Sequence, residues 1–250
     1  MSSKFPVVTV SPARRFWSLF TVAFGTVVFF VIVGFASKVL RALVEGHVAG
    51  GLRTRATLTL SGSAAGECLV LVLLVLFLHF RSRSLRELGL WQPSPLRGWI
   101  VAGIFTALYV LMTLAALRGR AALNELSSFH LCNSLVAGLS AGFVEEIFFR
   151  GWVMGELKWS GLGPAVQVIA SGILFGVAHV GWGLLTTNIN WAVAFGSITA
   201  TAVLGILYAI AYLVSRRSLM PVVVGHMTAD ILLEPWLVLA ALSAARASHL

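Results

Sequence analysis

Three short strings in the C-terminal half of the chain place acidic, basic and imidazole side chains at helical spacing. They are Glu145-Glu146 followed by Arg150, Phe175 followed by His179, and His226 followed by Asp230. Residues four apart share a helix face, so Arg150 can neutralise Glu146 while Glu145, turned away by about 100°, stays free to act as a base. Asp230 can likewise accept a ring N–H of His226 and fix its tautomer. Two carboxylates and two histidines are enough to hold and deprotonate a water molecule.

The chain that carries these groups has the composition of a membrane protein. Hydrophobic residues make up 58% and charged residues 11% of the sequence, and the mean hydropathy is +0.94. Soluble domains have roughly 45–50% apolar and about 25% charged residues. The apolar runs are long and continuous, whereas the strands of a membrane barrel would read as alternating segments of about 10 residues. We therefore expect an all-α, polytopic bundle of seven to eight transmembrane helices, and an integral multi-pass protein.

A hydrocarbon core requires about 20 apolar residues in each helix. Spans are predicted at 16–37, 61–80, 98–117, 131–149, 163–182, 191–215 and 219–244, with a Gly-rich loop or interfacial turn at 38–55. The eighth helix would arise if the last span breaks at Pro235, because proline removes a backbone donor. We divide the chain into N-terminal helices and loops at 1–130 and a functional core at 131–245.

The net charge of +9 does not indicate a nucleic-acid partner. The basic residues stand in short clusters between apolar runs, such as Arg53 with Arg55 and Arg216 with Arg217. This placement is typical of loops anchored at lipid headgroups. The lipid bilayer is therefore the expected partner.

Ionisable side chains within a membrane are costly, at least about 2.5–3.5 kcal/mol near the middle of a helix, and each one marks a candidate site. Glu67, His79 and Glu156 are expected near helix ends, where long side chains reach the interface. The groups of the three strings remain. Structural alternatives for them are an interfacial salt bridge for Glu146 and Arg150, and interhelical hydrogen bonds for the histidines.

Several classes of peptidase can be tested against the residues. A zinc site of the His-Glu-x-x-His type is excluded because no histidine is followed by glutamate, and an aspartyl dyad is excluded because the chain has a single aspartate. Ser140 stands in a G-x-S-x-G string at 138–142, but inside an expected helix and not at a strand-to-helix turn. Glycines four apart more simply permit close helix packing, and such pairs occur at Gly138/Gly142, Gly151/Gly155 and Gly172/Gly176.

The three strings, in this order on successive hydrophobic segments, resemble the CPBP family of CAAX proteases and bacteriocin-processing enzymes, also called the Abi family. The resemblance covers 131–236. It implies an intramembrane endopeptidase in which Glu145 activates the hydrolytic water and Glu146 supports it. His179 and His226 would orient the water or bind a metal, and Asp230 would occupy a position that is Asn or Asp in the family. Arg150 and Phe175 would be structural supports.

The resemblance leaves the cofactor open between a metal-free mechanism and a divalent metal, zinc if any, held by Glu145, His179 and His226. The implied substrate is a membrane-associated peptide or protein, and the location is the plasma (inner) membrane if the source is bacterial. The oligomeric state stays open. Two rivals are a catalytically idle immunity or scaffold protein and a proton-coupled transporter, although no inverted repeat of the kind common in transporters is evident.

Overall fold

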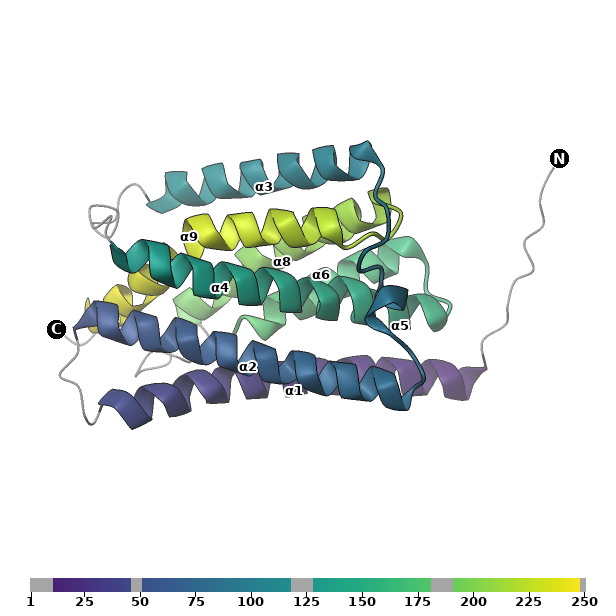
Figure 1. Cartoon of the computed structure of the whole chain (residues 1–250), viewed down its shortest axis with the longest axis horizontal. Helices are drawn as coiled ribbons and strands as arrows, with labels where there is room; N and C mark the ends of the chain where they lie inside the picture. The colour runs from purple at the N-terminus through teal and green to yellow at the C-terminus, as the bar shows by residue number, and fades with distance from the viewer. Residues whose placement is uncertain (1–10, 46–50, 118–127, 181–190, 248–250) are drawn as a thin grey trace.

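The computed structural model describes residues 11–45, 51–117, 128–180 and 191–247. Its helices run side by side along the long axis of the molecule (Figure 1). They are α1 (Pro12–Glu45), α2 (Leu52–Phe80), α3 (Leu96–Leu117), α4 (Ser128–Glu146), α5 (Met154–Trp159), α6 (Pro164–Ala178), α8 (Trp191–Val214) and α9 (Met220–Ala247), with a short 3₁₀ helix η1 (Leu85–Leu88) and a π-helical segment η3 (Ile147–Val153). The described residues contain no strand, so the predicted all-α bundle is confirmed.

Among the described residues, six helices are long and apolar enough to cross a membrane, which is fewer than the predicted seven to eight spans. The difference arises at α6, where a span was predicted at 163–182. This helix has 15 residues, and a rise of about 1.5 Å per residue gives it a length of roughly 22 Å. A hydrocarbon core is about 30 Å thick. The last two residues of the predicted span lie outside the described part of the chain.

Two interruptions, the loop predicted at 38–55 and the break left open at Pro235, are not found as described from the sequence. The loop expected at 38–55 is helical at both ends, since α1 continues to Glu45 and α2 begins at Leu52; residues 46–50 are not described. The stretch after residue 37 contains good helix formers, which let α1 continue past its most apolar part. The last helix, α9, also runs through Pro235 without ending. A proline is tolerated inside a membrane helix because neighbouring helices and polar side chains can satisfy the backbone group that loses its hydrogen bond.

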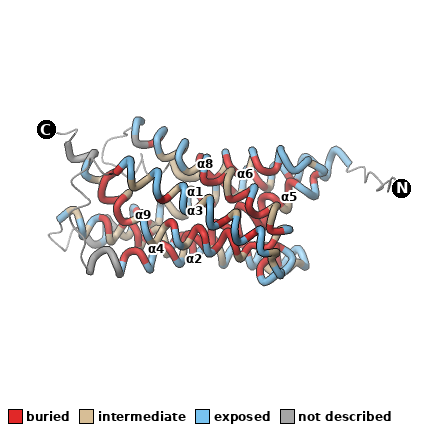
Figure 2. The backbone as a smooth tube through the Cα atoms, turned by 90° about the horizontal axis from the view of Figure 1, so that it is seen from above, coloured by how far each residue is buried: buried red, intermediate tan, exposed pale blue. Residues whose placement is uncertain are grey.

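The fourth predicted span was expected to end at residue 149, but the helix continues. Seven residues of η3 connect α4 to α5, and all seven are buried. Buried residues lie mainly in the interior of the bundle, and exposed residues lie mainly on its outside (Figure 2). Glu145 and Glu146 therefore lie in the middle of a long helical segment and not at its end.

Two close contacts between helices position the elements that carry the candidate site. A Cβ atom at Gly142 would come 2.5 Å from the backbone nitrogen of Met227 on α9. A Cβ atom at Gly176 would come 2.6 Å from the carbonyl oxygen of Ile198 on α8. Glycine spacing thus predicts close packing correctly for α4 and α6. It does not at Gly155, where a Cβ atom would meet nothing within 4 Å.

Candidate active site

Glu146 is the centre of a buried chain of charged groups. Its Oε1 lies 2.9 Å from Nη1 of Arg150, and both side chains are 0% exposed. The same oxygen accepts a hydrogen bond from Nδ1 of His226 at 2.8 Å. Because a carboxylate paired with arginine accepts hydrogen bonds, Nδ1 carries the proton in this contact. Glu146 thus sets both the orientation and the tautomer of His226.

Arg150 and Phe175 pack against Glu146 and the two histidines. The Arg150 guanidinium donates from Nη2 to the carbonyl of Gly205 at 3.2 Å and lies 4.4 Å from the centre of the Phe175 ring. The Phe175 ring also contacts both imidazoles, with centroid separations of 4.6 Å to His179 and 5.6 Å to His226. The two residues expected as structural supports are therefore packed against the groups that they were expected to support.

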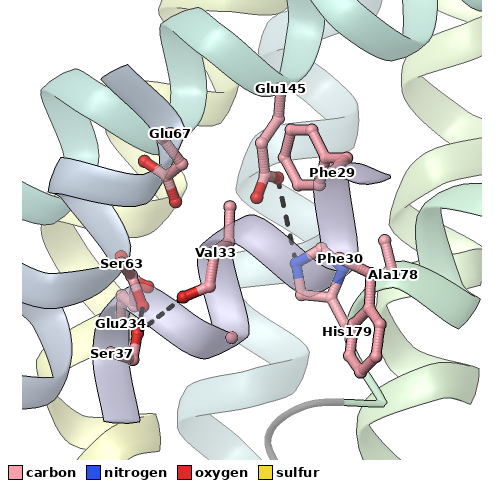
Figure 3. A pocket seen from close by; sticks show the side chains of 11 residues that line it. Phe29, Phe30, Val33, Ser37, Ser63, Glu67, Glu145, Ala178, His179 and Glu234 are labelled. Atoms are coloured by element: carbon pink, nitrogen blue, oxygen red, sulfur yellow. Dashed lines mark hydrogen bonds and ion pairs between the residues drawn. The ribbon is translucent and has the colours of Figure 1, made fainter. Parts of the chain in front are cut away.

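His179 lies at the end of α6, with its ring held by the backbone of the preceding turn. Its Nδ1 is 2.7 Å from the carbonyl oxygen of Phe175. A carbonyl oxygen can only accept, so Nδ1 is the donor and Nε2 is again left as an acceptor. This Nε2 faces Glu145 across the cavity (Figure 3). Both histidines thus have their Nδ1 atoms anchored, and the Nε2 atoms of both face Glu145.

Glu145 lies between the two imidazoles. Its Oε2 is 3.8 Å from Nε2 of His179 and 3.9 Å from Nε2 of His226. These separations are too long for direct hydrogen bonds, and no described residue donates to this oxygen. The Glu145 Oε2 atom and the two Nε2 atoms thus face one another without a direct hydrogen bond. A bridging water molecule would connect them.

Asp230 occupies a different place from the one expected. Its Oδ2 lies 3.3 Å from Nε2 of His226, on the side of the ring away from Nδ1, and it has no hydrogen-bond partner among the described residues. The structure gives the tautomer-fixing hydrogen bond to Glu146 instead. The reason is that α4 packs directly against α9, which brings a residue 80 positions away closer to Nδ1 than the residue one turn on.

A cavity of about 60 Å³ opens beside Glu145 and His179 (Figure 3), which is enough for several water molecules. Two further acids line it, Glu67 from α2 and Glu234 from α9. The sequence reasoning missed both. Glu67 was expected near a helix end because the second span was predicted to begin at 61, yet α2 begins at Leu52, and this places Glu67 in mid-helix. Glu234 follows Asp230 by one helical turn, and this spacing could have indicated that both lie on the same face of the helix.

Two other ionisable groups lie away from this cavity. His79 is exposed near the end of α2, as expected. Glu156 is buried and does not reach toward the interface, because it forms an ion pair with Nη1 of Arg83 at 2.8 Å. Burial lowers the pKa of Arg83 from its ordinary value, and the Glu156 carboxylate opposes that shift. This pair joins the segment after α2 to α5, and neither residue lines the cavity.

The chemistry of the three expected metal ligands suits zinc, but their spacing does not. One carboxylate and two imidazoles with anchored Nδ1 atoms are common zinc donors. Bonds of about 2.0–2.1 Å would put neighbouring donors roughly 3.3 Å apart around a tetrahedral ion, closer than the 3.8 and 3.9 Å found here. In the described ranges no group of three His, Cys, Asp or Glu side chains is arranged to hold a metal ion.

Comparison with known protein families finds one match to this part of the chain. Residues 127–232 match the family model described as type II CAAX prenyl endopeptidase Rce1-like. This match contains all three strings and confirms the resemblance to the CPBP, or CAAX protease, family. Neither a curated protein nor a solved structure matches the chain. Together with the six apolar helices in the described part of the chain, the match indicates an integral multi-pass membrane protein.

Proposed function

We propose that this protein is an intramembrane endopeptidase that hydrolyses a membrane-associated peptide or protein with a water molecule activated by glutamate and histidine. The observation that carries the proposal is the convergence of Glu145 Oε2 with two anchored imidazoles whose Nε2 atoms face it at 3.8 and 3.9 Å. Three acceptors around one space are the surroundings that a water molecule needs to be held and deprotonated.

In the proposed reaction, Glu145 takes a proton from the water while the water oxygen bonds to the carbonyl carbon of the scissile peptide. The histidines orient the water, and Glu146 with Arg150 keeps His226 in the tautomer that accepts at Nε2. Glu145 then returns the proton to the peptide nitrogen as the carbon–nitrogen bond breaks. Asp230, when protonated, is positioned to donate to the oxyanion, which is the part an asparagine would play.

The finer assignments of substrate, membrane and metal form part of the same proposal. Suitable substrates are a bacteriocin-like leader, a membrane-anchored regulator or a prenylated C-terminus, and a bacterial source would place the protein in the plasma (inner) membrane. No nucleic acid takes part. Should a divalent cation be used, Glu145, His179 and His226 would be its ligands after a small closure of the site. Such an ion lowers the pKa of bound water.

Cleavage of a membrane-tethered peptide library by the purified full-length protein in liposomes, with and without a chelator, tests this function. Glu145→Gln keeps the shape of the side chain but cannot take the proton, so we expect turnover to fall about 10²- to 10⁴-fold. Glu87→Gln, at an exposed glutamate on η1, is the matched control and should cleave at the parent rate.

Three outcomes would contradict the proposal, and a fourth would change its mechanism. Undiminished cleavage by Glu145→Gln would remove the general base. No cleavage of any peptide by the folded parent protein would favour the idle scaffold. Uptake of a solute driven by a pH gradient, lost in Glu145→Gln, would favour the transporter. Loss of cleavage with the chelator, restored by zinc, would transfer water activation to the metal.

A further inference from the structure

The cavity beside Glu145 holds more carboxylates than water activation uses. Glu67 and Glu234 line it together with Glu145 and His179. The three glutamates lie within electrostatic range of one another. No lysine or arginine side chain is found among the described residues that line the cavity. Like charges in one apolar environment repel. None of the described lining residues supplies a cation that would offset this repulsion.

Glu67 is the most constrained member of the cluster. It is 4% exposed, and its side chain projects toward the cavity from the middle of α2 (Figure 3). Its carboxyl group lies close to the Ser140 hydroxyl, and the Glu67 Oε2 atom has no hydrogen-bond partner among the described residues. A buried carboxylate oxygen without a donor is costly, and such a group requires a ligand, a proton or a water molecule.

The remaining walls of the cavity are apolar or already satisfied. Phe29, Phe30 and Val33 from α1 form one side of it. The hydroxyls of Ser37 and Ser63 are 2.8 Å apart and bond to each other. A hydrated divalent ion requires oxygen ligands on most sides. A lysine or arginine side chain instead combines an apolar stem with a charged head, which is the pattern of this lining.

The cavity is also accessible to a chain lying along α1. Gly34 lines it, and a Cβ atom added there would meet no heavy atom within 4 Å. The adjoining wall residue Phe30 is only partly buried. The missing side chain thus leaves open space on the rim, close to the carboxylates. A substrate side chain of moderate length could reach Glu67 from this rim while its backbone stays near Glu145.

We propose that this cavity is a specificity subsite for a basic side chain of the substrate, whose ammonium or guanidinium group binds between Glu67 and Glu234. This inference rests on the proposed endopeptidase function, because it assigns the residue preference of the same site. It predicts that a lysine or arginine near the scissile bond is required for efficient cleavage.

The test uses pairs of membrane-tethered peptides that are identical except for lysine or its neutral isostere norleucine at one position. The position is scanned on both sides of the cleaved bond with the full-length protein in liposomes. At one position we expect kcat/KM to be about 10- to 100-fold higher for lysine, because a hydrogen-bonded charge is lost in the isostere. Glu67→Gln should reduce that ratio to within about threefold of unity.

Glu234→Gln provides a second variant, since Glu234 is only partly buried and its replacement is less demanding for folding. It should reduce the ratio in the same direction. Glu156→Gln is the matched control: it removes another buried carboxylate, but one that is paired with Arg83 away from the cavity. We expect this variant to melt at a lower temperature and to keep the lysine preference of the parent.

A binding measurement separates this inference from the proposed function. The affinities of fluorescent lysine and norleucine peptides with a non-hydrolysable bond are compared by anisotropy for the parent and for Glu67→Gln. A lysine preference that disappears in Glu67→Gln supports the subsite even if no peptide is cleaved. Equal kcat/KM for lysine and norleucine at every position overturns it while leaving the endopeptidase intact. Displacement of the lysine peptide by micromolar zinc or magnesium, with no lysine preference in cleavage, would assign the cavity to a metal ion and also overturns it.

Discussion

Replacing Arg150 by methionine should destabilise the protein severely, because it leaves the Glu146 carboxylate buried without its cation. The ion pair measures 2.9 Å and neither side chain is exposed. Removing one partner of a fully buried pair typically costs about 3–5 kcal/mol. The change also removes the donor to the carbonyl of Gly205 and the cation over the Phe175 ring. These losses share one guanidinium and do not add, so we expect a total loss of about 3–5 kcal/mol.

The assay is a double-mutant cycle on the free energy of unfolding. The parent, Arg150→Met, Glu146→Gln and the double variant are unfolded in mixed micelles by titration with a denaturing detergent. If the two side chains stabilise each other, the double variant should lose less than the sum of the single losses, by about 2 kcal/mol or more. Glu146→Gln keeps an acceptor for Nδ1 of His226, so the cycle reports mainly on the charge pair.

Two results would refute this reasoning. A coupling energy below about 0.5 kcal/mol would mean that the pair contributes no more than independent residues do. A well-folded Arg150→Met protein that no longer binds substrate would identify Arg150 as a clamp for the substrate and not as the partner of Glu146.

Three further predictions follow from single contacts. Ser140→Ala should keep at least about a third of the turnover, because its hydroxyl donates to the carbonyl of Val136 within α4 and a general-base mechanism does not need it as a nucleophile; loss of about 10²-fold would favour a serine mechanism. Gly142→Ala should lower the free energy of unfolding by about 1–3 kcal/mol through overpacking against Met227, whereas Gly155→Ala, which has open space, should be neutral or stabilising by up to about 1 kcal/mol; equal effects would contradict the packing argument. Gly34→Phe should fill the cavity rim and raise KM for tethered peptides about tenfold or more, whereas Gly196→Phe on the exposed face of α8 should leave KM as it is; an unchanged KM in both would place substrate entry elsewhere.

The local part of the site could be predicted from the sequence because helical spacing is a local property. The pairing of Glu146 with Arg150 follows from their separation by four residues, and so does the proximity of His226 and Asp230. The hydrogen bond from His226 to Glu146 could not be predicted in this way. It depends on how closely α4 and α9 pack, and the glycine spacing indicates a close contact without naming the partner helix.

Hydropathy indicated where the membrane helices are but not where they end. A run of apolar residues marks the segment that must lie in lipid, whereas a helix continues for as long as its backbone is satisfied and no breaker stops it. The earlier start of α2 matters for the candidate site because it changes the position of one acidic residue in the helix. With α2 beginning at Leu52 and not at 61, Glu67 lies in mid-helix and lines the cavity.

The π-helical segment η3 changes the phase of the helix between the paired acids and the residues that follow. A π-turn adds one residue to a helical turn, which rotates the residues after it by about 100° relative to those before it. The acids before η3 can thus face α9 and the cavity, while Met154 and Leu157 after it still face the core. Arg150 lies within the same segment and pairs with Glu146 across its first turn. The departure from regular helix geometry is thus part of how the buried acids are held in place.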